Sequence, residues 1–175
     1  MVTDPVKATV PEDIFAGGGE MGALMRNSYA SGTALPNGDA ERSLDWSQTL
    51  LGPVSQWAQS LKTAVSIILN SHYPMFIWWG SEYANLYNDA YRPILGASKH
   101  PQFLGQSAKQ CWAEIWDVIG PLADSVLTTG QPTWSDNLLL MINRYGYVEE
   151  TYFTFSYSPI RDESGGVGGV FCAVI

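Results

Sequence analysis

The last third of the chain alternates between apolar and polar side chains with the two-residue period of a β-strand. In residues 150–160 an aromatic side chain stands at every second position from Phe153 to Tyr157, with threonine and serine between them. The turn-like segment 161–166 leads into a second apolar run, 167–175, and another run, 134–143, precedes them. Three antiparallel strands connected as a meander are therefore predicted for this part of the chain.

The middle of the chain combines a helix, a strand pair and further helices. A helix starting near Pro53 is predicted because apolar residues follow a helical spacing: Trp57, Leu61, Ala64, Val65, Ile68 and Leu69. This stripe must be buried on the domain's own sheet, on a second copy, or on both. Residues 75–79 and 83–87 predict two paired strands, and helices are predicted over 112–116 and 119–129. This order predicts an α+β fold with an antiparallel sheet.

The first 43 residues differ in amino-acid composition from the rest of the chain. They are rich in glycine, proline and asparagine, which predicts a flexible leader with at most a short helix over 20–26. The glycines at 17–19 are interpreted as a turn rather than a phosphate-binding loop, because no strand precedes them and no GK[ST] follows. We therefore divide the chain into a leader (1–43), a helical segment (44–72) and a domain of mixed helices and strands (73–175).

Charge and composition narrow the classes of partner. Nine basic and seventeen acidic residues give 9 − 17 = −8, so phosphate backbones and anionic lipid are repelled. Neither a membrane-spanning segment nor a signal peptide is recognisable, which predicts a cytoplasmic protein without membrane insertion. Cys111 and Cys172 are interpreted as reduced thiols, and no metal-binding spacing is present.

Two motifs in this order resemble the PAS sensory domain. Residues 86–96, LYNDAYRPILG, are similar to the family's "xxNxAyxxllG" stretch, and residues 155–170, FSYSPIRDESGGVGGV, are similar to its "xxxPixdxxGxvxGvv" hairpin. The resemblance covers about residues 74–175. The segment FAGGGEMG at 15–22, with residues 45–47 and 51–53, also resembles the start of a group of bacterial sensor histidine kinases.

The resemblance implies a five-stranded antiparallel sheet with short helices over one face and an N-terminal helical cap. It implies a non-catalytic sensory and dimerisation module of a two-component histidine kinase, with a homodimer formed through the cap helix. A small ligand or partner would bind, and a conformational signal would pass to a kinase domain in cis. Histidine phosphorylation, the phosphorelay and ATP binding would belong to domains after residue 175. This chain would then be a fragment of a longer protein.

Candidate ligand-binding residues follow from an aromatic pocket of the kind that holds a planar guest. We predict that it is bordered by Trp112, Trp116, Tyr87 and Phe155, with Asn88 or Asn137 orienting the guest by hydrogen bonds. No cofactor is strongly implied.

The alternatives are a flavin- or haem-binding sensor of the same fold and a small enzyme. Cys111 lacks the Asn-Cys-Arg-Phe-Leu-Gln frame of the family's flavin branch, and the helix over 119–129 has no histidine for haem. His72 and His100 lie in loop-like segments, where solvated histidines are usual. Glu149 and Glu150 are neighbours in a strand and point to opposite faces, so they do not form a carboxylate pair. No catalytic motif frame is present.

Overall fold

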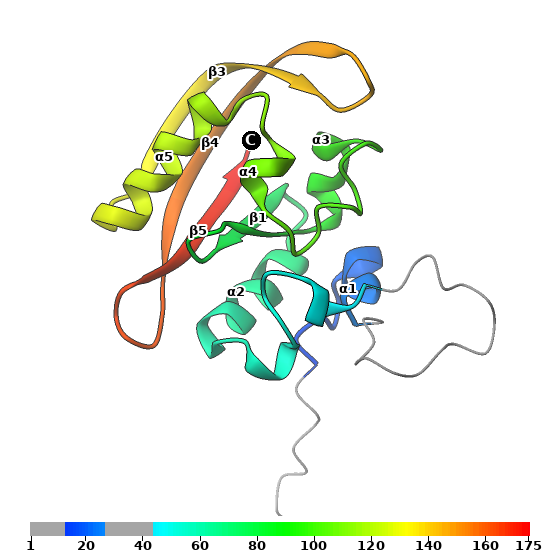
Figure 1. Cartoon of the computed structure of the whole chain (residues 1–175), viewed down its shortest axis with the longest axis vertical. Helices are drawn as coiled ribbons and strands as arrows, with labels where there is room; N and C mark the ends of the chain where they lie inside the picture. The colour runs from blue at the N-terminus through cyan, green and yellow to red at the C-terminus, as the bar shows by residue number, and fades with distance from the viewer. Residues whose placement is uncertain (1–12, 27–43) are drawn as a thin grey trace, which may run out of the picture.

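The computed structural model describes residues 13–26 and 44–175, in which five strands form one antiparallel sheet (Figure 1). The spatial order is β2-β1-β5-β4-β3. The strands are β1 (Met75–Trp79), β2 (Ala84–Tyr87), β3 (Thr133–Asn143), β4 (Val148–Arg161) and β5 (Val167–Val174). The fold class predicted from the sequence is confirmed, because the first hairpin and the final meander share one sheet rather than forming two layers.

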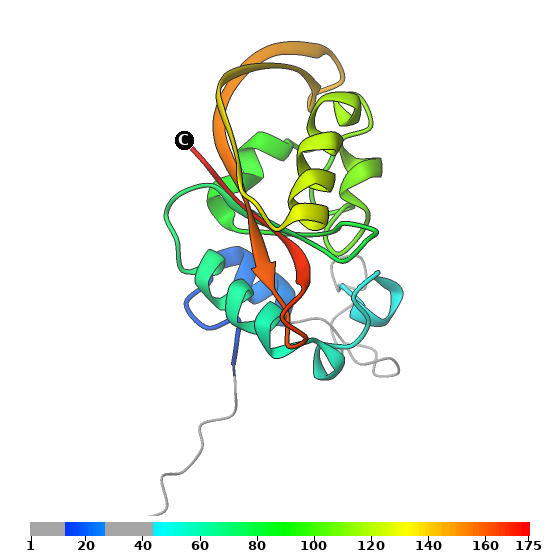
Figure 2. The same cartoon turned by 90° about the vertical axis from the view of Figure 1, so that its left-hand side faces the viewer.

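Helices lie on both sides of this sheet, with α5 on one side and α2 towards the other (Figure 2). The α-helices are α1 (Gly19–Arg26), α2 (Gln59–Leu69), α3 (Arg92–Leu95), α4 (Ala108–Cys111) and α5 (Trp116–Thr129). Three short 3-10 helices are η1 (Trp46–Gln48), η2 (Val54–Gln56) and η3 (Asp89–Tyr91). None of the helices in the described ranges is long and apolar enough to cross a membrane.

The helix α2 buries its apolar stripe within its own domain. Leu61, Val65 and Ile68 are at most 1% exposed, and α2 packs on β1, β2 and β4. The expected start near Pro53 is wrong, because Trp57 and Ala58 are extended and α2 begins only at Gln59. The proline starts the separate turn η2 instead.

The predicted helix over 112–116 is also displaced. The Ser107 side chain caps the N-terminus of α4 by accepting a hydrogen bond from the Gln110 N–H, so α4 begins at Ala108, and it ends at Cys111. The longer helix α5 then begins at Trp116, three residues before the expected start. Both shifts place Trp112 in the turn between two helices, where its indole faces the sheet.

Residues 13–26 are packed rather than loop-like, which differs from the expected leader. The short helix α1 is present as expected, but Met21 and Met25 are completely buried. A Cβ atom on Gly18 would lie 2.9 Å from the Leu69 side chain, and one on Gly19 would overlap an Asp89 carboxylate oxygen. The glycine run is therefore a site of close packing. The other leader residues, 1–12 and 27–43, lie outside the described residues.

The N-terminus of α2 is capped by a carboxylate from the β4–β5 turn. Glu163 Oε1 accepts a hydrogen bond from the Ser60 N–H at 2.6 Å, and Glu163 Oε2 accepts one from the Ser60 hydroxyl at 3.1 Å. These hydrogen bonds, the backbone one first, hold the pKa of Glu163 below its usual 4.5. The sheet and the helical cap are thus joined by a bond that requires an ionised side chain.

We expect the stabilisation by this cap to disappear in acid. A lowered pKa in the folded state means that the stabilisation is present above about pH 4.5 and is lost as the pH falls through the folded value. Glu163→Gln should therefore lower the melting temperature at pH 7, and the difference from wild type should be smaller at pH 3 than at pH 7. An equal difference at both pH values would contradict a charge-dependent cap.

Candidate functional site

The sheet and the α3–α5 segment enclose a cavity of about 40 Å³. It is lined by Phe76, Trp78, Tyr91, Ile94, Trp112, Ile115, Ile119, Leu140, Ile142, Phe153, Phe155, Tyr157, Cys172 and Val174. The strand residues reach it because the inward positions of β1, β4 and β5 are in register, with Cys172 opposite both Phe76 and Tyr157. Every lining residue is uncharged, so the site is a neutral aromatic chamber.

Three polar groups border this chamber without a hydrogen bond to any described residue. The Trp112 indole N–H is buried and unpartnered, and the hydroxyls of Tyr91 and Tyr157 make no hydrogen bond within the described ranges. Burial raises the pKa of both tyrosines well above 10. The nearby Trp112 indole N–H acts in the opposite direction and lowers the pKa of Tyr91, although no contact between the two side chains meets hydrogen-bond geometry. A buried donor without a partner costs free energy, which an acceptor placed in the cavity would recover.

A partly buried ion pair stabilises residues 99–116, here called the lid, which cover the cavity. Lys99 Nζ lies 2.9 Å from Glu114 Oε1 and 4.9 Å from the centre of the Trp112 ring. The same Glu114 Oε1 accepts a hydrogen bond from the Asn143 N–H at the end of β3, at 3.1 Å. Lys99 therefore fixes Trp112 and the α4–α5 turn against the edge of the sheet.

The six predicted ligand residues do not form one site. Trp112 and Phe155 line the cavity. Trp116 lies behind it, with ring centres 5.4 Å from Trp78 and 5.2 Å from Tyr83.

The other three predicted residues lie away from the cavity. Tyr87 is buried on β2, and its hydroxyl pairs with His100 Nδ1 at 2.7 Å. Asn137 is exposed at a β-bulge with a φ of 50°, and Asn88 serves the backbone, as described below. The asparagine amides thus face no shared guest.

Sequence reasoning missed the larger part of the cavity lining. The place of Tyr157 in the cavity could have been predicted, because the alternation along β4 puts it on the same face as Phe155. Phe76 and Trp78 alternate in the same way on β1, with ring centres 4.6 Å apart. Tyr91 gave no comparable signal, because its position in the cavity depends on the geometry of η3.

Asn88 is a structural hub rather than a ligand residue. Its Nδ2 donates to the carbonyl oxygens of Ile68, Ser71 and Tyr73 at 2.8–3.2 Å. Its Oδ1 accepts from the Met75 N–H and the Tyr91 N–H, each at 3.1 Å. All hydrogen-bonding capacity of this buried amide is used by the backbone, and its bond to the Tyr91 N–H makes it the cap of η3.

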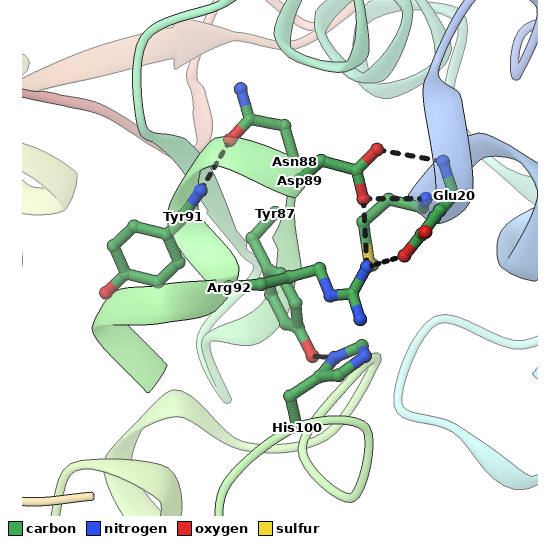
Figure 3. A network of polar contacts seen from close by, with 8 residues as sticks. Glu20, Tyr87, Asn88, Asp89, Tyr91, Arg92 and His100 are labelled. Atoms are coloured by element: carbon green, nitrogen blue, oxygen red, sulfur yellow. Dashed lines mark hydrogen bonds and ion pairs between the residues drawn. The ribbon is translucent and has the colours of Figure 1, made fainter. Parts of the chain in front are cut away.

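A polar network surrounds this hub (Figure 3). The Asp89 carboxylate accepts hydrogen bonds from the Glu20 N–H at 2.8 Å and the Met21 N–H at 3.0 Å. Arg92 is paired with the Glu20 carboxylate, whose pKa it lowers, and lies 3.4 Å from Asp89. The N-terminus of α1 is therefore attached to η3 by charge and by backbone hydrogen bonds.

Neither flavin nor haem fits these residues. A cavity of about 40 Å³ is far below the ~300–1,000 Å³ of sites for larger ligands. Cys111 does not line the cavity, and burial raises its pKa to about 12, so it is a protonated thiol rather than a nucleophile. The chain's two histidines lie elsewhere, His72 on the surface and His100 against Tyr87. The described residues also contain no cluster of acidic, cysteine or histidine side chains suited to a metal.

The strand order, the antiparallel register and the helical lid over one face define the fold of PAS and LOV sensory domains. No protein-family model and no curated protein matches the chain. Among solved structures, a variant of RsLOV matches with a TM-score of 0.50 and 15% identity, over 67% of each chain.

Two further matches are weaker. A sensory box sensor histidine kinase from Vibrio cholerae has a TM-score of 0.43 and 15% identity, over 58% of this chain and 79% of that one. VqmA bound to DPO has a TM-score of 0.45 and 18% identity, over 59% of this chain. The chain spans about half the length of that protein, 51%. The likeness to the RsLOV variant, at 15% identity, establishes the fold alone.

Proposed function

We propose that the chain is the sensory module of a bacterial two-component histidine kinase. It binds a small neutral molecule in the aromatic cavity and passes a conformational signal to a kinase domain in the same protein. The module itself is non-catalytic and cytoplasmic, and its net charge of −8 disfavours nucleic acid and membrane surfaces as partners. The motifs that resemble PAS domains and sensor kinases support this assignment.

The observation that carries the proposal is the unpartnered Trp112 N–H in an uncharged cavity. Polar groups buried in protein interiors are nearly always hydrogen-bonded, so the indole indicates a missing acceptor. The lining offers no cation to pair with an anion, and transfer of a charge into such a site is costly. The ligand class is therefore a neutral molecule with a hydrogen-bond acceptor.

The size of the cavity sets a second condition. A water needs about 10–15 Å³ and benzene occupies engineered cavities of about 150 Å³, so the present 40 Å³ holds only a few non-hydrogen atoms. A larger guest must displace the lid that carries Trp112. Binding and lid movement are then linked, which is what a sensor needs to convert occupancy into a population shift.

We expect small neutral acceptor compounds to raise the melting temperature, whereas their carboxylate analogues should not. Trp112→Phe keeps an aromatic ring but removes the N–H donor, so it should abolish most of this shift. Trp134→Phe is the matched control, because Trp134 is 63% exposed and should leave the shift unchanged. A panel without any shift, or a shift that Trp112→Phe preserves, would reject the proposed ligand site.

We further propose that the module forms a homodimer through the cap. Most of the α2 stripe is used within the domain, but Ile67 is 60% exposed beside a groove of about 620 Å³ that Ile160 and Phe171 also line. A competing surface is the outer apolar patch on β3 and β4, formed by Trp134, Leu139, Met141 and Tyr152.

Sedimentation equilibrium can separate these two surfaces. We expect Ile67→Glu to convert a dimer to a monomer, because a charge at an apolar contact is costly to desolvate. Met141→Glu should leave the dimer intact. The reverse pattern would assign the interface to the outer apolar patch, and a monomeric wild type would remove dimerisation from the proposal.

A further inference from the structure

Residues 88–92, here called the η3 junction, contact the cavity and both N-terminal helices. Tyr91 faces the cavity, Asp89 and Arg92 hold α1, and Asn88 holds the end of α2. Figure 3 shows these side chains diverging from one short turn. Such a turn is a direct mechanical connection between a ligand site and flanking helices.

The cavity end of the junction is Tyr91. Its side chain is 4% exposed, and its ring centre lies 4.9 Å from that of Phe76 on β1. A guest that enlarges the cavity must press on this ring, because well-packed interiors have little free space to absorb a displacement.

The α1 end of the junction is Asp89 with Arg92. The Asp89 carboxylate satisfies two backbone N–H groups of the first turn of α1, which have no partner within the helix itself. Contact at this point is close, since Gly19 allows the Asp89 carboxylate to approach with no room for a side chain. A shift of Asp89 therefore removes the cap of α1 instead of stretching it.

Asn88 makes the junction rigid. Its side chain accepts from the Tyr91 N–H within the turn and donates to the Ile68 carbonyl at the end of α2 at 2.9 Å. Tyr91 and Asp89 are thus held in one turn whose position relative to α2 is set by hydrogen bonds. Movement of Tyr91 is transmitted to Asp89 because the turn has no soft point between them.

We propose that the η3 junction couples the cavity to α1, so that cavity occupancy controls whether α1 is docked. This coupling rests on the proposed function, because it describes how occupancy of the same cavity changes the conformation of another part of the protein. By linkage, release of α1 must in turn change the cavity. The helix α1 is then the output element of the sensor on its N-terminal side.

Hydrogen exchange measured by NMR on the 175-residue chain tests whether a change in the cavity affects α1, and it needs no ligand. Tyr91→Leu should raise the exchange rates of the Glu20 and Met21 amides at least about tenfold. Ile142→Ala, which alters the same cavity from β3, is the matched control and should raise them no more than it raises exchange in the core strands. Tyr91→Met, which also removes the ring but has a longer and more flexible side chain, serves if the leucine variant does not fold.

The reverse direction uses the cavity isoleucines. Asp89→Ala should shift the methyl resonances of Ile94 and Ile115, whereas Glu163→Ala, which uncaps α2 instead of α1, should not. Unchanged methyl resonances in Asp89→Ala, or unchanged α1 exchange in the Tyr91 variants, would overturn the coupling. Because no ligand is used, failure here leaves the ligand site standing, and failure of ligand binding leaves this coupling standing.

Discussion

Replacing Asn88 with alanine should destabilise the protein by about 3–5 kcal/mol, measured by urea unfolding. The substitution removes five hydrogen bonds and leaves buried backbone groups of the α2–β1 connection and η3 without partners. Each such group costs about 1–3 kcal/mol, and the effects are not additive because water enters part of the site. We expect this single side chain to contribute as much to the free energy of unfolding as a large core residue does.

Two variants control this prediction. Asn88→Asp keeps the acceptor oxygen but loses the donors to the three carbonyl groups, so it should remain strongly destabilising. Asn70→Ala removes an exposed amide that also donates to two carbonyls, and it should cost no more than about 1 kcal/mol. Equal losses for Asn70→Ala and Asn88→Ala would show that burial of the hub is unimportant.

Trp78→Ala should also cost about 3–5 kcal/mol, and small aromatic molecules should recover part of that loss. Trp78 is 1% exposed and lines the cavity, and its ring centre lies 5.3 Å from that of Tyr157 with the ring planes tilted by 58°. Removal of the indole would enlarge the existing chamber, and enlarged apolar cavities of this kind bind benzene-sized guests. The expected result is a destabilised variant whose melting temperature rises with indole concentration.

Trp134→Ala provides the matched comparison for this substitution. Trp134 lies on the outer apolar patch and is 63% exposed, so its loss should change stability by less than about 0.5 kcal/mol. It should give no response to indole. A Trp78→Ala variant that indole does not stabilise would indicate that the sheet collapses onto the chamber and that the lid is not a separate element.

The strands and the α2 stripe were predictable because each depends on a short repeating pattern. The two-residue alternation identifies β4 whatever its neighbours are, and the apolar spacing identifies the buried face of α2. The single five-stranded sheet was expected from the resemblance to PAS domains rather than from any pattern, and the strand order was not predicted. Helix starts were less predictable, because a proline such as Pro53 fits the first turn of either an α-helix or a 3-10 helix.

Of the six predicted ligand residues, only Trp112 and Phe155 line the cavity. One reason is that the strand periodicity is interrupted in β3, and another is that periodicity does not predict tertiary hydrogen bonds. Asn137 was expected at the pocket, but the β-bulge between Ser135 and Leu138 shifts the register and places it on the surface. The docking of α1 was missed for a different reason. Gly18 and Gly19 are required by the close approach of Leu69 and Asp89, and the sequence alone does not show that these partners are near.

The most direct test of the ligand site is an NMR titration of the Trp112 indole N–H with acetamide and acetate, two molecules of the same shape that differ in charge. Trp112→Phe assigns the resonance by its disappearance. The neutral cavity predicts a saturable shift with acetamide and none with acetate. If acetamide leaves the chemical shift of the indole N–H unchanged, or if acetate changes it equally, the result would contradict a neutral ligand-binding cavity under the lid.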